Sequence, residues 1–259
     1  MRELTFKDAV PFIESIPNQD KLTLVGGQAL CFWYEFYYDK YQELFSDDWL
    51  ISTQDIDFLG NQDAVRECAK AWGADPKLSA IDDHTPNSGI VRIDYDGEVL
   101  IIDFLWNVQG LEKSDIEKKR FEMIIPTADG GSTSFFILSP FLCLVSRISN
   151  ILTLGRTDQH PIDQLKAAVK VVNCLIDEYL EAGEEKQARQ LVENIYNLAM
   201  SKTEGIKIYT DFDVDIFEAI PEDTRFNENF IKERFPRMKK ALSERRISII
   251  NHLQHRKGE

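Results

Sequence analysis

Hydrophobic and polar positions follow two different periods along the chain, and the pattern changes near Ser139. Before this residue, segments with the two-residue period of a β-strand are mixed with segments that have the 3.6-residue period of an α-helix. After it, only the helical period is found. The pattern therefore predicts an α+β protein, in which residues 1–138 form a mixed sheet with helices and residues 139–259 form an all-helical region.

Six strands and three helices are predicted in the first part. The strands are Lys21–Val25, Asp55–Leu59, Ile90–Tyr95, Glu98–Trp106, Glu122–Ile125 and Ser134–Leu138, and the helices are Phe6–Ile13, Gln28–Leu44 and Asp63–Trp72. The dipeptide Asp96-Gly97 predicts a two-residue hairpin turn. That turn would place Ile90 opposite Asp103, and Arg92 diagonally beside Asp103 on the polar face.

Helices account for the second part. Ser139 can cap the first of them, Pro140 suits its first position, and the helix would end near Gly155. The others are predicted from His160-Pro161 to about Gly183, from Glu184 to Met200, and from Ile231 to about Leu253. This change of pattern predicts a domain boundary near Ser139.

The composition excludes several classes of protein. The chain has 44 acidic and 30 basic side chains and a formal net charge of −14, which opposes general binding to nucleic acid. No run approaches 18 apolar residues, the four cysteines form no C-x-x-C pair, and the first 20 residues carry acids among their apolar positions. These features argue against a membrane span, a disulfide scaffold, a zinc ribbon and a signal peptide, and they predict a cytoplasmic protein.

The charge is unevenly distributed. It is −13 in residues 1–138 and −1 in residues 139–259, and the segment 232–257 carries +7. This basic segment is either a solvated helix face or a site for a phosphate-rich ligand. The acidic first part argues against a large RNA as partner, whereas the basic segment argues for one.

Three carboxylates are candidates for chemistry. Asp55 and Asp57 lie two residues apart in a predicted strand and therefore point to the same face. Asp103 interrupts an apolar strand, where an acid is costly unless it is paired or binds a cation. Mg²⁺ prefers oxygen ligands and also holds phosphate groups, so it would relieve the repulsion among the three. Taken singly, the acids also fit structural roles, including an ion pair between Asp103 and Arg92.

Gly26-Gly27 lies between a predicted strand and a predicted helix. Glycine lets backbone N–H groups approach a phosphate closely, and the N-terminus of a helix attracts anions. A simple turn is the ordinary role of such a pair. The order strand, Gly-Gly, helix, Asp-x-Asp and third Asp is much more specific than any one of these motifs.

This order of motifs resembles the DNA polymerase β superfamily of nucleotidyltransferases. The closer similarity is to its AbiEii-type branch, which consists of toxin-like proteins associated with phage defence. The resemblance depends on Leu24–Leu30 with its Gly-Gly turn, Ser52–Phe58 with its Asp-x-Asp, and Ile102–Phe104 as the third motif. Ser139–Asn150 and His160–Leu165 resemble the start of the family's helical part.

The resemblance implies a nucleotidyltransferase fold for residues 1–138 and a helical domain in residues 139–259. It implies a transferase that moves a nucleoside monophosphate from an NTP to an acceptor hydroxyl on RNA, a protein or a small molecule. Asp55, Asp57 and Asp103 would be catalytic and bind Mg²⁺ or Mn²⁺. The nucleotide would be held by Gly26, Gly27, Ser52, Thr53, Arg92 and Arg147. A cognate antitoxin is a further implied partner, and a membrane is not.

Two features depart from the family pattern. Gly27 and Asp55 are 28 residues apart, which is longer than usual, and Arg147 stands where the family often has a Lys followed four residues on by an acid. Arg cannot act as a base, and Asp163 is the nearest substitute for one in this region, unless it is only an acid in the first turn of its helix. Two alternatives stay open: a non-catalytic nucleotide-binding sensor or interaction module on the same fold, and a metal-dependent phosphodiesterase or nuclease.

Overall fold

A seven-stranded mixed sheet forms the first part of the protein. The computed structural model describes residues 3–257 except 50, 81, 84 and 128, with side chains up to residue 252. The strands lie in the order β3-β4-β5-β2-β1-β7-β6. They are β1 Thr23–Val25, β2 Ile56–Leu59, β3 Pro76–Leu78, β4 Asn87–Tyr95, β5 Glu98–Leu105, β6 Phe121–Pro126 and β7 Ser132–Ile137. The predicted mixed sheet is therefore confirmed.

The β4–β5 hairpin has the register predicted from its turn. Asp96 and Gly97 have φ angles of 55° and 82°. A two-residue hairpin turn of type I′ requires such left-handed conformations at both residues. As predicted, Ile90 pairs with Asp103. Because β5 also pairs in parallel with β2, the hairpin places Asp103 next to the strand that contains the Asp-x-Asp motif.

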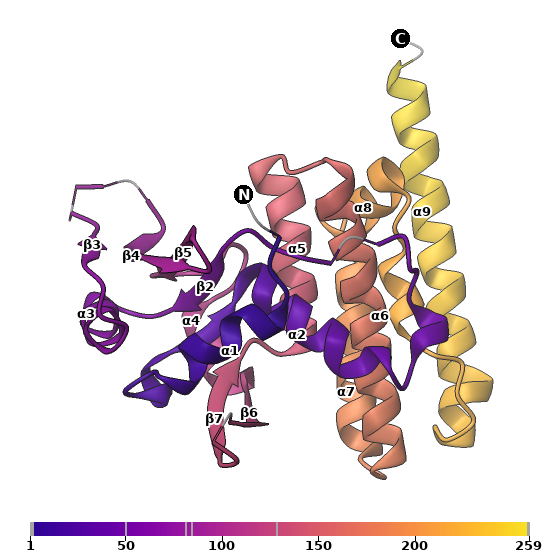
Figure 1. The fold of residues 1–259 in the computed structure, drawn as a ribbon. Coiled ribbons are helices and arrows are strands. Elements are labelled where there is room, and N and C mark those ends of the chain that lie inside the picture. The colour runs from indigo at the N-terminus through magenta and orange to yellow at the C-terminus, as the bar shows by residue number, and fades with distance from the viewer. Residues whose placement is uncertain (1–2, 50, 81, 84, 128, 258–259) are drawn as a thin grey trace.

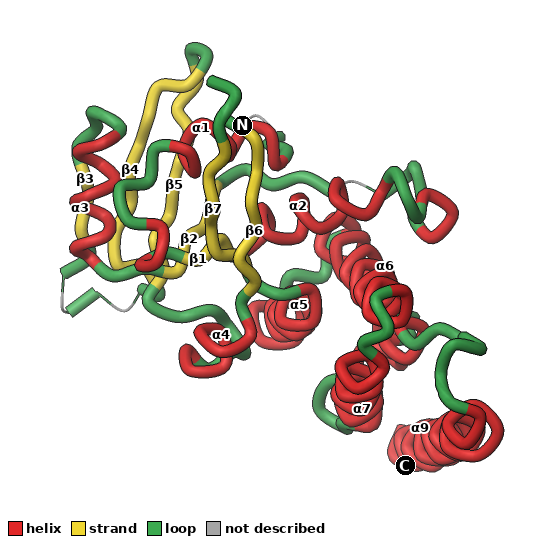
Figure 2. The backbone as a smooth tube through the Cα atoms, turned by 90° about the horizontal axis from the view of Figure 1, so that it is seen from below, coloured by secondary structure: helices red, strands yellow, loops and turns green. Residues whose placement is uncertain are grey.

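Helices cover the sheet and continue the chain beyond it. Those of the first part are α1 Phe6–Glu14, α2 Gly26–Tyr38, α3 Gln62–Ala71 and α4 Lys113–Lys119. After β7, the described residues contain helices α5 Pro140–Leu154, α6 Gln159–Glu181, α7 Glu185–Met200, α8 Gly205–Phe212 and α9 Phe235–Lys257. Figure 1 shows the sheet and the later helices side by side, with α9 farthest from the sheet, and Figure 2 shows the same arrangement from below.

The ends of α5 follow the predicted signals. Pro140 is its first residue and Gly155 ends it with a φ of 65°, as predicted; Ser139 occupies the N-cap position in an extended conformation, but its side chain makes no capping hydrogen bond. Within the described residues, no helix combines the length and apolar character needed to cross a bilayer. The second part is thus a helical region, as the pattern predicts.

Helix α2 connects the two parts of the molecule. It packs against β1 and β2 on one side and against α5 and α6 on the other. Trp33, in the middle of the helix, is fully buried, and its indole N–H donates to the carbonyl oxygen of Leu138 at 2.7 Å. Beyond the helix, the hydroxyl of Tyr41 donates to the carboxylate of Asp177 on α6 at 2.6 Å. The sheet and the later helices therefore share one hydrophobic core.

Some boundaries differ from the prediction. Helix α2 begins two residues earlier than expected, at Gly26, and ends at Tyr38 instead of near Leu44. Tyr41 and Leu44 still pack on the core, but from the N-cap and the last residue of a short 3₁₀ helix, so their apolar spacing alone wrongly predicts a longer α-helix. Helix α9 begins at Phe235 after a short π-helical segment. The short elements β3, α4 and α8 are not predicted by the pattern at all.

Candidate active site and metal centre

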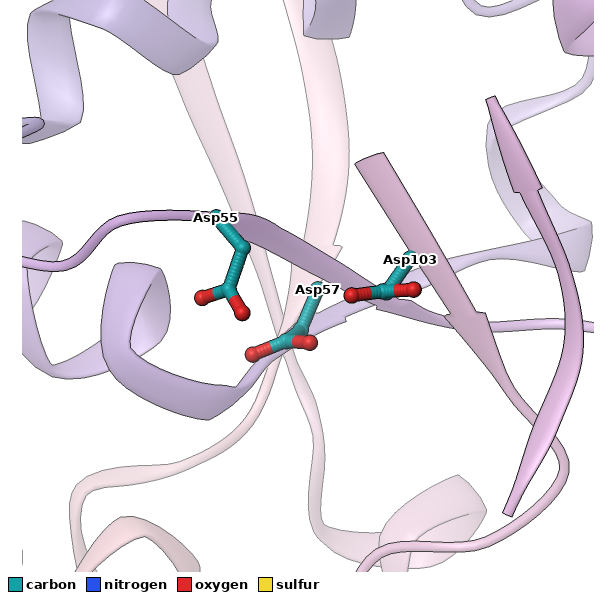
Figure 3. A group of neighbouring side chains, drawn as sticks. All are labelled: Asp55, Asp57 and Asp103. Atoms are coloured by element: carbon teal, nitrogen blue, oxygen red, sulfur yellow. The ribbon is translucent and has the colours of Figure 1, made fainter. Parts of the chain in front are cut away.

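Three carboxylates meet on one face of the sheet, next to the start of α2. Asp57 on β2 and Asp103 on β5 are register partners in a parallel pair, and Asp55 lies two residues before Asp57. One carboxylate oxygen from each of the three lies within 4.8 Å of the other two. Figure 3 shows the side chains of Asp55, Asp57 and Asp103 gathered on the same side of the strands. We call these three residues the carboxylate cluster.

Alternation along the two strands places the cluster where it is. Ile56 and Phe58 flank Asp57, and Ile102 and Phe104 flank Asp103; all four are fully buried on the opposite face. Because successive side chains of a strand point to opposite faces, burying these four residues directs both aspartates toward the other face. Alternation thus determines the face of each aspartate, and the pairing of β2 with β5 brings the two together.

Burial and repulsion between carboxylates oppose ionisation of Asp57 and Asp103. Burial, followed by the charges of Asp55 and Asp103, raises the pKa of Asp57 to about 7, and Arg147 and Arg156 oppose the rise. Burial and then Asp55 raise the pKa of Asp103 to about 6, and Arg92 opposes that rise. A bound cation would remove the repulsion that keeps protons on these groups.

We expect the metal-free protein to lose stability as the pH rises from about 4 to about 7. An unfolded Asp has a pKa of about 3.9, so over this range the folded cluster binds more protons than the unfolded chain, and the free energy of unfolding falls with rising pH. Asp57→Asn should flatten this fall in a series of thermal melts in EDTA. Asp75→Asn, at an exposed position before β3, is the matched control. Equal pH profiles for the wild type and Asp57→Asn would contradict the expectation.

Two glycines bring α2 close to the cluster. Gly26 has a φ of 64°, and a Cβ at this position would lie 1.9 Å from Oδ2 of Asp57. A Cβ on Gly27 would lie 2.7 Å from Oγ1 of Thr53. The N-terminus of a helix carries a partial positive charge that favours carboxylate and phosphate groups. The Gly-Gly pair is therefore required for the close approach and not only for a turn.

The cluster opens into a cavity of about 930 Å³ between the sheet and helices α5 and α6. This volume lies within the range of small-molecule sites. Among the predicted site residues, those that line the cavity are Gly26, Gly27, Thr53, Asp55, Asp57, Asp103 and Arg147. The hydroxyl of Thr53 donates to Oδ1 of Asp55 at 3.0 Å and so fixes the orientation of that carboxylate.

Arg147 presents a buried positive charge to the same cavity. Its side chain is 8% exposed, and Nη1 donates to Oε1 of Gln164 at 2.9 Å. Within the described residues, its guanidinium forms no ion pair with a carboxylate. Burial lowers the pKa of Arg147, although the nearby charge of Asp57 opposes this. A buried guanidinium whose protein partner is a neutral amide is well suited to bind an anionic ligand.

Ser52 and Arg92 lie outside the cavity lining. The hydroxyl of Ser52 donates to Oε2 of Glu3 at 2.6 Å, and its carbonyl oxygen accepts a hydrogen bond from Nε2 of Gln164 at 2.9 Å. Arg92 is exposed on β4, and the described residues include no ion pair between it and Asp103. Instead, Nδ2 of Asn87 donates to Oδ1 of Asp103 at 2.8 Å. Through its two hydrogen bonds, Ser52 connects its own segment with those of Glu3 and Gln164 around the site.

Several cavity residues escape the sequence analysis. Arg156, His160 and Gln164 lie at or near the start of α6, and Asn87 lies on β4. Nε2 of His160 is 3.0 Å from the carbonyl oxygen of Ser52, a contact across more than 100 residues of sequence. In the sequence, His160–Leu165 indicates a helix start and contributes to the family resemblance, but it does not predict a place in the cavity. Asp163, considered as a substitute acid, is not part of the lining and accepts a hydrogen bond from Gln159 instead.

The carboxylate cluster has the composition of a site for a divalent cation. Three carboxylates supply oxygen ligands, which Mg²⁺ and Mn²⁺ prefer. In the described part of the chain, no Lys or Arg forms a salt bridge with any of the three, so their charge is available to a cation. The residues present therefore fit a hard cation, and their chemistry does not distinguish Mg²⁺ from Mn²⁺.

Comparisons of the chain with models of protein families, with curated proteins and with solved structures gave no match. The case for a function therefore depends on the geometry of the cavity and on the residues that line it.

Proposed function

We propose that the protein is a metal-dependent nucleotidyltransferase that moves a nucleoside monophosphate from an NTP to an acceptor hydroxyl. One arrangement supports this activity above all: the carboxylate cluster, the Gly-Gly start of α2 and the buried Arg147 all face one cavity. The cluster suits a cation, and the other two features suit phosphate groups. The resemblance of the same motifs to AbiEii-type nucleotidyltransferases supports the same assignment.

The reaction assigns a task to each group. The acceptor oxygen forms a bond to the α-phosphorus, the bond from that phosphorus to the oxygen bridging to the β-phosphate breaks, and pyrophosphate leaves. Asp55, Asp57 and Asp103 would hold the cation, which when bound neutralises phosphate charge and activates a coordinated oxygen. Asp103 would also help to activate the acceptor hydroxyl, as the carboxylate placed to accept its proton. Arg147 and the N-terminus of α2 would bind the triphosphate.

Mn²⁺ should bind the wild-type protein and bind the double variant Asp55→Asn/Asp57→Asn at least about tenfold more weakly, a change of ~1.4 kcal/mol. Asn keeps the shape of Asp but lacks the charge that a hard cation requires. Isothermal titration calorimetry measures both affinities, and Asp75→Asn serves as the control for loss of an exposed aspartate. Equal affinity in the double variant would show that the cation binds elsewhere.

The activity itself is tested with NTPs labelled on the α-phosphorus, incubated with Mg²⁺ or Mn²⁺ and a cell extract. We expect label to enter one fraction of the extract with wild-type protein and not with Asp57→Asn. Digestion of that fraction with a ribonuclease or a protease then identifies the acceptor class. Absence of label with all four NTPs in every fraction would contradict the proposal.

A further inference from the structure

Five apolar side chains, which we call the apolar wall, line the same cavity as the carboxylate cluster. The wall consists of Leu105, Trp106 and Val108, which follow Asp103 along the chain, and of Ile151 and Leu154 on α5. Trp106 is 48% exposed and Leu154 52% exposed, and few other large hydrophobic side chains in the described residues are so accessible. An exposed apolar surface within a polar cavity is typical of the part of a site that binds the ring system of a ligand.

The backbone before and after Trp106 is anchored to neighbouring segments. The backbone N–H of Trp106 donates to the carbonyl oxygen of Pro86 at 2.8 Å, and Val108 is 6% exposed. Gly110 has a φ of 78° and packs so tightly on α5 that a Cβ there would lie 2.5 Å from Cβ of Ser149. The backbone on either side of the indole is therefore fixed before a ligand binds, which reduces the entropy cost of binding.

Three side-chain amides without protein partners line the same cavity as the indole. The side-chain amides of Asn107, Gln109 and Asn150 line the cavity, and none of them makes a hydrogen bond with another described protein group. Each amide offers donors and an acceptor. A flat aromatic surface next to free amides is the chemistry that recognises a heteroaromatic ring with polar edges, such as a nucleobase.

The spacing along the chain suits one nucleotide. Trp106 follows Asp103 by three residues, so the two Cα atoms are at most about 10 Å apart along an extended chain. A triphosphate bound at the carboxylate cluster would thus leave its base within reach of the indole. We propose that Trp106 stacks on the nucleobase of the donor nucleotide, with the free amides facing the edge of the base. This inference rests on the proposed function, because it takes an NTP as the ligand.

Metal-free binding of the four ribonucleosides tests the stacking separately from catalysis. Isothermal titration calorimetry is suitable because it does not depend on the indole as a reporter. We expect at least one nucleoside to bind the wild type, and Trp106→Ala to weaken it about 5- to 150-fold, the range that base–aromatic stacking contributes. Trp106→Phe, which keeps an aromatic face, should restore most of the affinity. Val99→Ala, at a position 64% exposed on β5 and outside the cavity, is the control.

The outcomes separate the two proposals. Equal nucleoside affinity in the wild type and Trp106→Ala would overturn the stacking proposal, as would a wild type that binds no nucleoside or binds ribose 5-phosphate just as well. Nucleoside binding that depends on Trp106, in a protein with no transfer activity, would contradict the proposed function and support the stacking. As the control for folding, the melting temperature of each variant should be close to that of the wild type.

Discussion

Asp103→Asn is expected to lower nucleotidyl transfer at least about 100-fold, or ~3 kcal/mol, the scale of a lost electrostatic contribution to the transition state. Asn has nearly the shape of Asp, and its Oδ1 can still accept the hydrogen bond from Asn87. It cannot carry the charge that binds a cation or accept the proton of a hydroxyl. Initial rates with saturating NTP measure the loss.

The same substitution should leave the metal-free protein as stable as the wild type or more so. It removes one of three mutually repelling carboxylates, and Arg92 would not lose an ion pair because the described residues contain none with Asp103. If Asp103 has a structural role instead, the free energy of unfolding of the variant should fall by a few kcal/mol while the activity is retained. Melting in EDTA and turnover, measured together and compared with Asp75→Asn, separate the two. An unstable but active variant would remove Asp103 from the catalytic residues.

Arg147→Met is expected to lower kcat/KM for the NTP about 10- to 100-fold, because a charge-assisted hydrogen bond to phosphate contributes ~1.5–3 kcal/mol. Met keeps the length and the apolar contacts of the buried side chain. Since Arg147 is 8% exposed and its hydrogen-bond partner is the neutral Gln164, relief of the desolvation cost should offset the lost attraction to Asp57, so the free energy of unfolding should change little. The measurement is kcat/KM for the NTP together with a thermal melt.

A matched control is Arg189→Met on α7, where the arginine is exposed and its nearest carboxylate oxygen, on Glu185, is 3.9 Å away. It should leave kcat/KM unchanged. Arg147→Lys is expected to recover only part of the activity, because an ammonium lacks the planar fork of the guanidinium. If Arg147→Met keeps the wild-type kcat/KM and loses stability, Arg147 is a structural residue and the phosphate site lies elsewhere.

The part of the site that lies on adjacent strands is predictable from the sequence. The Asp96-Gly97 turn determines the hairpin register, and strand alternation then places Asp103 on the same face as Asp57. The hairpin register and the alternation depend on local geometry, whereas the pairing of β5 with β2 is a long-range contact that the structure supplies. The Gly-Gly position is predictable for the same reason, although the collision of a Cβ on Gly26 with Asp57 is visible only in three dimensions.

The contribution of the helical region is not predictable in this way. His160 and Gln164 reach the site because α6 packs over the carbonyl of Ser52, more than 100 residues earlier in the chain. No periodicity encodes such a contact. Similarly, the pattern predicts Trp106 only as the end of a strand, and its place on the cavity wall depends on the packing of the following loop against α5.

The basic segment 232–257 illustrates the same limit. Counting charges leaves both a phosphate site and a solvated helix open. In the structure, Arg234 pairs with Glu193, Lys239 with Glu222, and Arg246 with Asp215. The acidic partners come from other parts of the chain, so much of the local excess of positive charge is compensated within the fold. The described side chains of this segment therefore favour a structural role.

The most direct test of the central claim compares NTPs labelled on the α- and γ-phosphorus, incubated with Mg²⁺ or Mn²⁺ and cell extract. A nucleotidyltransferase with this site should attach the α-label to an acceptor and release the γ-label as pyrophosphate, and Asp103→Asn should prevent both. The claim would be contradicted if the α-label appeared only as free monophosphate, if the γ-label became bound to the acceptor, or if neither label moved with any of the four NTPs.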